Sequence, residues 1–220
     1  MANGNDFKPQ GKYSSATLTS QYTLNTEHAQ RVHRRCFEGA ARALFTIDVI
    51  ARALSHGNKA FNYSEVMAAV ETLLSGLERD VINERDRFKH ILEQNNSANV
   101  TARYDNAAEF SFTVSTPLIM RLAQIIQAFD QMLIAAQTCW LMCFLDSDKN
   151  DLVANERMRQ LMRVIRKLQL MATDARKKAK KDVNAEAIAA NLGDAAEESE
   201  VDKQTASAIE EETAAAKSAA

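Results

Sequence analysis

A metal site is the first chemistry that the side chains of this sequence could support. His33 and Cys36 are three residues apart, and Cys139 and Cys143 are four apart, so each pair can share one face of a helix. Zinc requires four converging ligands, and the apolar run around the second pair indicates buried core thiols instead. No Ser-His-Asp order, glycine-rich phosphate loop or His-Glu motif is present. We therefore predict no metal, no cofactor and no enzymatic activity.

The segment 146–157, DSDKNDLVANER, resembles a calcium-binding loop over its first half. Oxygen-bearing side chains stand at loop positions one, three and five. Position six, where the turn needs glycine, is Asp151, and position twelve, where a bidentate Glu belongs, is Arg157. The segment is therefore predicted to be a polar turn between two helices.

Residues 109–115, EFSFTVS, alternate apolar and polar side chains, whereas the residues after Thr116-Pro117 follow a helical period. The alternation predicts a strand with two different faces. The inward face holds Phe110, Phe112 and Val114, and the outward face holds Glu109, Ser111, Thr113 and Ser115.

A single strand in a helical chain leaves backbone groups unpaired at its edges. Two copies of 109–115 from two chains would form an antiparallel ribbon across a homodimer, packed through the inward face. Such a ribbon fits the major groove of DNA, where the four outward side chains could contact base edges. The alternative partner is the weakly alternating segment 16–24, which would close a small sheet within the chain.

A strongly basic segment follows, and an acidic tail comes after it. Residues 157–181 contain ten Lys and Arg against one Asp, whereas residues 182–220 contain ten acids against two Lys. This pattern favours phosphate binding by the basic segment, although a solvated amphipathic helix would have the same composition. The predicted phosphate contacts are Arg103, Arg157, Arg159, Arg163, Arg166, Lys167, Arg176, Lys177 and Lys178.

The stretches 23–35 (TLNTEHAQRVHRR) and 110–146, with the basic helix after them, resemble the AcaB-like family. The similarity covers about residues 14–175. Proteins of this family are carried by conjugative plasmids and integrating conjugative elements, and they are regarded as ribbon-helix-helix transcriptional activators. The resemblance implies a sequence-specific DNA-binding regulator of conjugative transfer genes, with activation as the favoured mode. A helical adaptor that binds protein and not DNA is the competing interpretation.

The predicted fold is mostly α, because apolar residues recur at three- and four-residue spacing in four segments. These helices run from Thr26 to about Leu54, from Ser64 to about Gln94, from Pro117 onward, and from Leu152 onward. No internal repeat is apparent. The predicted organisation is an arm or short strand (1–25), a helical hairpin (26–96), a ribbon-helix-helix-like β-α-α unit whose strand pairs across a homodimer (104–181), and a disordered acidic tail (182–220).

Composition places few limits on partners but several on location. The 220 residues have 46 % hydrophobic content, 6 Gly, 2 Pro and three Cys, which is typical of a helical protein in a reducing compartment. The first twenty residues are polar, and the apolar run MLIAAQTCWLMCFL is too short to cross a bilayer. We expect a bacterial cytoplasmic protein with double-stranded DNA and a second copy of itself as partners. RNA polymerase is a further candidate partner, and no membrane contact is expected.

Overall fold

Both alternating segments form strands, and they pair with each other. In the computed structural model, which describes residues 7, 9, 11, 16–57, 63–182 and 184–218, strand β1 (Leu18–Leu24) lies antiparallel to strand β2 (Ala108–Val114). The register places Leu18 opposite Val114 and Leu24 opposite Ala108. The strand at 109–115 therefore finds its partner in its own chain, and its predicted pairing with a second subunit is not what forms this sheet.

All four predicted helical segments are confirmed, with two differences. The helices are α1 (Glu27–Val32), the π-helical turn η1 (His33–Phe37), α2 (Glu38–Gly57), α3 (Tyr63–Gln94), α4 (Pro117–Leu141) and α5 (Ser147–Ala179). The first predicted helix contains the π-helical turn, which inserts extra backbone between α1 and α2. The last begins at Ser147, with Asp146 as N-cap, so residues 147–157 are helical and the prediction of a turn over 146–157 is wrong.

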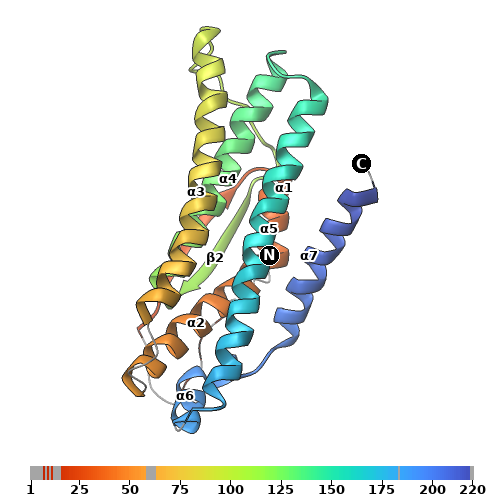
Figure 1. The fold of residues 1–220 in the computed structure, drawn as a ribbon. Coiled ribbons are helices and arrows are strands. Elements are labelled where there is room, and N and C mark those ends of the chain that lie inside the picture. The colour runs from red at the N-terminus through yellow and green to blue at the C-terminus, as the bar shows by residue number, and fades with distance from the viewer. Residues whose placement is uncertain are drawn as a thin grey trace.

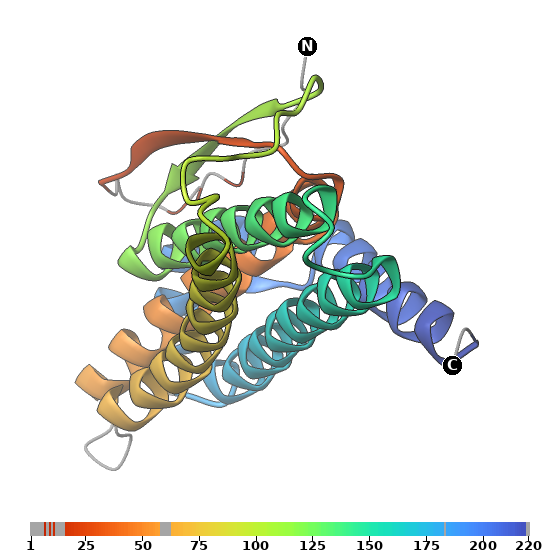
Figure 2. The same cartoon turned by 90° about the horizontal axis from the view of Figure 1, so that it is seen from above.

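The elements form three layers (Figures 1 and 2). The sheet lies on a middle layer formed by α1, α2 and α4. Helices α3 and α5 lie on the other side of that layer. The main core runs through all three layers and includes Leu44, Phe88, Phe129 and Ile165. α4 is long and apolar enough to cross a bilayer, but 61 % of its apolar window is buried inside the protein, as expected of a core helix.

The order strand–helix–helix occurs twice along the chain. Residues 18–94 form a first unit and residues 108–179 form a second unit. The units are interlocked, because α2 of the first packs on α5 of the second and α3 of the first packs on α4 of the second. A shift of 90 positions superimposes the strands and the helix starts at Glu27 and Pro117. The expectation that the chain has no internal repeat is therefore wrong at the level of structure.

The sequence keeps a short trace of this duplication at the junction between strand and helix. TLNT at 23–26 corresponds to TVST at 113–116, and Arg31 corresponds to Arg121. The remaining side chains differ between the units, which is why the repeat escapes notice in the sequence.

The acidic C-terminal segment is folded over residues 184–218, contrary to the predicted disorder. It contains α6 (Ala185–Leu192), the 3-10 turn η2 (Gly193–Ala196) and α7 (Glu200–Ser218). Ile188 and Leu192 are buried in a second apolar cluster with Phe45 and Leu54, and Ile209 belongs to the main core. The composition of this segment wrongly suggested that it cannot fold. A few apolar side chains, together with buried charge pairs, are enough to hold it on the surface formed by the other helices.

Candidate nucleic-acid interface

The β1–β2 ribbon has one face buried on the helices and one face exposed. Tyr22 and Leu24 from β1 and Phe110, Phe112 and Val114 from β2 are all less than 9 % exposed. The predicted inward face of β2 is thus confirmed, but its side chains pack on helices of the same chain. The exposed side chains of the opposite face are Thr19, Gln21, Thr23, Glu109 and Ser111.

Two of the four predicted base contacts are not available on this face. Thr113 is only 4 % exposed, and Ser115 is half-buried with its hydroxyl oxygen fully covered. Strict alternation predicts both side chains on the exposed face, but it does not predict that they are covered at this end of the ribbon. The three exposed side chains of β1 were missed as site residues. The weak alternation of 16–24 could have indicated these residues. It predicts a strand, but it does not predict which side chains that strand exposes.

An aromatic cluster packs against the buried face of the ribbon. The Tyr22 ring centroid lies 5.1 Å from that of Phe112, and Phe37 packs on Phe112 at the same distance. The Tyr22 hydroxyl lies 2.6 Å from Nδ1 of His33, whose ring stacks on Phe37. Burial lowers the pKa of His33 to about 4 and raises the pKa of Tyr22, so the phenol keeps its proton and donates to a neutral imidazole.

A buried carboxylate fixes the junction between β1 and α1. Asp130 of α4 is 2 % exposed and accepts hydrogen bonds from the backbone N–H groups of Asn25 and Thr26. It also accepts from the Thr26 hydroxyl at 2.7 Å and from the Asn25 amide at 3.1 Å. Asp130 of the second unit thereby holds the end of strand β1 of the first unit.

The cations predicted to bind phosphate lie mostly on α5, away from the ribbon. Figure 2 shows the sheet on one side of α4 and α5 on the other. Arg163, Lys167, Lys177 and Lys178 are exposed there, and Arg159 is half-buried. Because the layer of α1, α2 and α4 separates them from the outer face of the sheet, the chain does not bring these cations together with the predicted base contacts.

Three of the predicted phosphate contacts are engaged within the chain. Arg157 lies 3.4 Å from Glu84, and Arg166 lies 3.3 Å from Glu210. Arg176 is 7 % exposed, and its prediction as a phosphate contact is wrong. Helical periodicity does not reveal this burial, because the side chain that covers Arg176 comes from the C-terminal segment.

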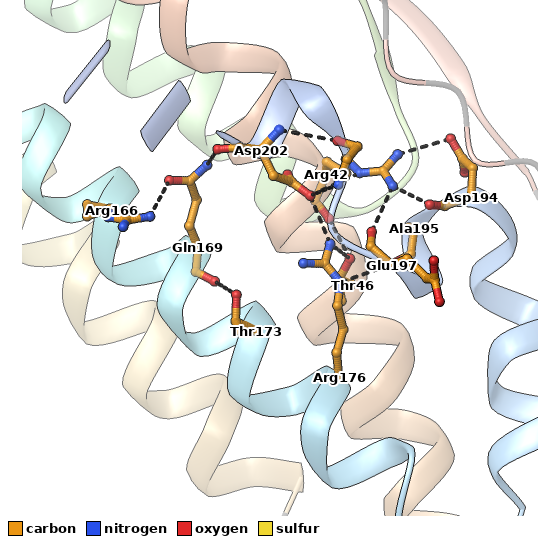
Figure 3. A network of polar contacts seen from close by, with 11 residues as sticks. Arg42, Thr46, Arg166, Gln169, Thr173, Arg176, Asp194, Ala195, Glu197 and Asp202 are labelled. Carbon is orange, nitrogen blue, oxygen red and sulfur yellow. Dashed lines mark hydrogen bonds and ion pairs between the residues drawn. The ribbon is translucent and has the colours of Figure 1, made fainter. Parts of the chain in front are cut away.

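Arg176 belongs to a buried charge network (Figure 3). Asp202 of α7 accepts from Arg176 Nη2 and from Arg42 Nε, both at 3.3 Å. Arg42 also pairs with Asp194 at 3.0 Å, and Arg176 Nε donates to the carbonyl of Ala195. Burial lowers the pKa of Arg176, and the negative charge of Asp202 opposes that shift. The network ties the acidic segment to α2 and α5, so these charges serve the fold.

One exposed cation, Arg34, lies close to the ribbon instead. The Arg34 guanidinium carbon is 5.5 Å from the centroid of the Phe110 ring. Arg103, the one predicted phosphate contact outside the basic segment, is exposed in the connection that leads into β2. The neighbouring Arg35 is paired with Glu211 of α7 at 2.5 Å. Arg34 was missed although the stretch RVHRR at 31–35 is basic, because the prediction looked for phosphate contacts in the longer basic segment 157–181.

The cysteines do not form a metal site in the described residues, where no group of three or more His, Cys, Asp or Glu could hold a metal ion. Cys36 and Cys139 are buried, as predicted, and burial raises the pKa of Cys36 to about 12. Cys143 is exposed, contrary to the prediction, because α4 ends at Leu141 and the chain turns at Cys143 with φ 61°.

The fold thus defines a mostly helical protein of AcaB-like architecture, with one antiparallel ribbon laid on interlocked helices. The crystal structure of AcaB from uropathogenic E. coli matches this chain with a TM-score of 0.77. The match covers 90 % of this chain and 100 % of the AcaB chain at 22 % sequence identity, a level that establishes a shared fold. No protein-family model matches the sequence, and no curated protein matches it either.

Proposed function

We propose that this protein is a sequence-specific DNA-binding regulator that inserts the outer face of the β1–β2 ribbon into the major groove. The observation that carries the proposal is the ribbon itself, which buries one face on helices and exposes Thr19, Gln21, Thr23, Glu109 and Ser111 on the other. A two-stranded antiparallel ribbon has the width that the major groove admits. Amide, hydroxyl and carboxylate groups are the side chains that bond to base edges there.

The fold shared with AcaB supports a regulatory role. With the family resemblance of the sequence, it leads us to propose that the genes controlled are those of conjugative transfer and that control is by activation. A ribbon formed within one chain removes the reason for which a homodimer was predicted from the sequence.

The phosphate contacts in this proposal come from the cations beside the ribbon. Arg34 is exposed and lies over Phe110, near the end where Leu24 pairs with Ala108. Arg103 is exposed in the connection that enters β2 at that end. Cations placed at a ribbon end meet the phosphates that border the groove, and each one supplies salt-dependent affinity. The exposed cations of α5 face away and contribute little to the same complex.

The test is a mobility-shift titration of the full chain on the DNA upstream of its neighbouring genes, against a scrambled duplex. Gln21→Ala should weaken binding to the preferred duplex about tenfold or more, since a bidentate amide–base contact is worth about 1–3 kcal/mol. Gln204→Ala, an exposed glutamine of α7, is the matched control and should bind as the wild type does. Equal affinity of the wild type for both duplexes would contradict the proposal.

A protein-binding adaptor is the second candidate, favoured by exposed apolar side chains at the end of α4 and in the first turns of α5. Trp140, Leu141 and Leu152 are 42 %, 60 % and 61 % exposed. Exposed apolar side chains gathered at one place are typical of protein–protein contacts. If the chain binds no DNA and Leu141→Asp abolishes its association with a protein such as RNA polymerase, the adaptor function is correct and the DNA-binding function is not.

A further inference from the structure

The ribbon of this protein differs from that of a homodimer in one respect that affects DNA recognition. When two identical chains each supply a strand, a two-fold axis repeats the same side chains on both halves of the site, so the site is a palindrome. Here the same arrangement is built from β1 and β2 of one chain, with each unit packing its helices on those of the other. The strand register and the order of the elements follow a two-fold pattern, but nothing requires the side chains to follow it.

The outward side chains of the two strands are in fact different. Under the 90-residue correspondence, Thr19 corresponds to Glu109 and Gln21 corresponds to Ser111. Gln21 and Ser111 are also opposite each other in the register, so they occupy the middle of the ribbon. The central position therefore presents an amide on one side of the pseudo-two-fold axis and a hydroxyl on the other.

The surroundings of the ribbon are unsymmetrical as well. Glu109 lies opposite Thr23, and Arg34 lies over the ring of the adjacent Phe110. Arg103 precedes this end of the ribbon in the connection that enters β2. The residue that corresponds to Arg34 in the second unit is Gln124, which is uncharged. One end of the ribbon thus carries a carboxylate with a cation close to it, whereas the equivalent positions at the other end hold Thr19 and Gln124.

We infer that a single chain binds a DNA site without two-fold symmetry, and that Gln21 and Glu109 set its sequence. The inference rests on the proposed DNA-binding function. The Gln21 amide matches the N6 and N7 edge of an adenine near the centre of the site. The Glu109 carboxylate matches the N4 amino group of a cytosine toward one end. Arg34 and Arg103 neutralise phosphates at that same end, which fixes the direction of the chain on the duplex.

The experiment selects duplexes from a random pool with the full chain and then measures the mass of the complex on the shortest duplex that retains binding. We expect one chain per duplex and a selected sequence that is not a palindrome. Gln21→Ala should lose the preference for adenine at one central position, with affinity down about tenfold. Glu109→Gln should change the preferred base toward one end and leave the centre unchanged. Both positions are exposed, and Gln204→Ala again serves as the control.

The failures are distinguishable. A wild-type chain that selects no sequence overturns the proposed function, and the inference with it. A palindromic selected site occupied by two chains leaves DNA binding intact but overturns the inference. A non-palindromic site whose base preferences do not change in Gln21→Ala or Glu109→Gln overturns the assignment of these two side chains as specificity determinants.

Discussion

The two strand–helix junctions of this protein have the same backbone course but are held by different means. Thr26 before α1 bonds through its hydroxyl and its backbone N–H to the buried carboxylate of Asp130. Thr116 before α4 is similarly buried, at 4 % exposed, but its hydroxyl and that of Ser115 have no hydrogen-bond partner among the described residues. One end of the ribbon is therefore clamped by the opposite unit, and the other end contains two unpaired polar groups.

The cause lies in a single position. Counting back 90 residues from Asp130 gives Ala40, and allowing for the extra residue of the π-helical turn gives Ala41. Both are alanines with no polar side-chain atom, so the second junction has no carboxylate to receive its N–H and hydroxyl groups. The comparison teaches that a duplicated fold can keep its packing scheme while only one copy keeps the polar interaction that fixes it.

The arginines at equivalent positions show a second departure from symmetry. Arg121 in the second unit pairs with Glu78 of α3 at 2.8 Å. Its counterpart Arg31 pairs with Glu27 and, at 3.4 Å, with Glu212 of α7. The C-terminal segment thus supplies to the first unit an acid that the second unit finds in its partner helix. Removing contacts of the C-terminal segment should therefore affect the first unit more than the second.

The largest expected effect comes from Asp202→Ala. The change leaves the guanidinium groups of Arg42 and Arg176 buried without their shared counterion, which should cost about 4 kcal/mol. For a chain of this size, that loss corresponds to a fall in Tm of about 10 °C. Asp174→Ala, which removes an exposed acid paired with Lys177, is the control and should change Tm by less than about 2 °C. Thermal unfolding followed by circular dichroism measures both, and a similar small change in both variants would contradict a structural role for the network.

Asp130→Ala should destabilise the protein by about 3 kcal/mol, because it leaves several buried donors of Asn25 and Thr26 unsatisfied. The loss should be concentrated at the β1–α1 junction, making the clamped junction resemble the unclamped one. Hydrogen exchange of the amides of β1 and α1 should accelerate more than that of β2 and α4. The exposed Asp105 provides a matched Asp→Ala control. Uniform acceleration across both units would mean that Asp130 supports the whole core and not this junction.

The protein should become less stable as the pH decreases, because of His33 in the first unit. At the same distance from the strand, the second unit has Ala123. The folded-state pKa of about 4 lies below the ordinary value of 6.5, because burial disfavours the charged ring. The unfolded chain therefore gains the proton first, and stability present above pH 6.5 is lost as the pH falls toward 4.

Between pH 7 and pH 5 the loss attributable to His33 should be about 2 kcal/mol. His33→Gln should reduce this pH dependence, because glutamine can still accept from the Tyr22 hydroxyl and does not titrate. His90→Gln, at an exposed position, should leave it unchanged. Urea unfolding at a series of pH values gives the comparison, and an unaltered slope in His33→Gln would show that other groups, such as His28, dominate.

The sequence was sufficient to predict the elements that depend on local periodicity. The strand at 109–115, the helix start at Thr116-Pro117 and the inward direction of Phe110, Phe112 and Val114 all follow from spacing. Which strand pairs with which is a long-range property, and local spacing led us to favour a second chain over the segment 16–24, which is the strand's actual partner. The burial of Arg176 and the folding of the acidic segment also depend on contacts between distant residues, so composition pointed to phosphate binding and disorder instead.

The smallest expected effects give the sharpest comparison of the two junctions. Replacing Thr by Val keeps the side-chain volume and removes the hydroxyl. Thr26→Val should destabilise the protein by about 1.5–2 kcal/mol, because it removes a buried hydrogen bond to a carboxylate.

Thr116→Val should leave stability unchanged or raise it by up to about 1 kcal/mol, since it removes a buried hydroxyl that already lacks a partner. The usual penalty for losing an N-cap side chain should not appear there, because Thr116 makes no side-chain cap hydrogen bond. Denaturant unfolding of the two variants beside the wild type decides the matter, provided that the m-values agree. Equal losses at both positions would mean that Thr116 has a polar partner in solution, such as an ordered water, and that the two junctions are held equally well.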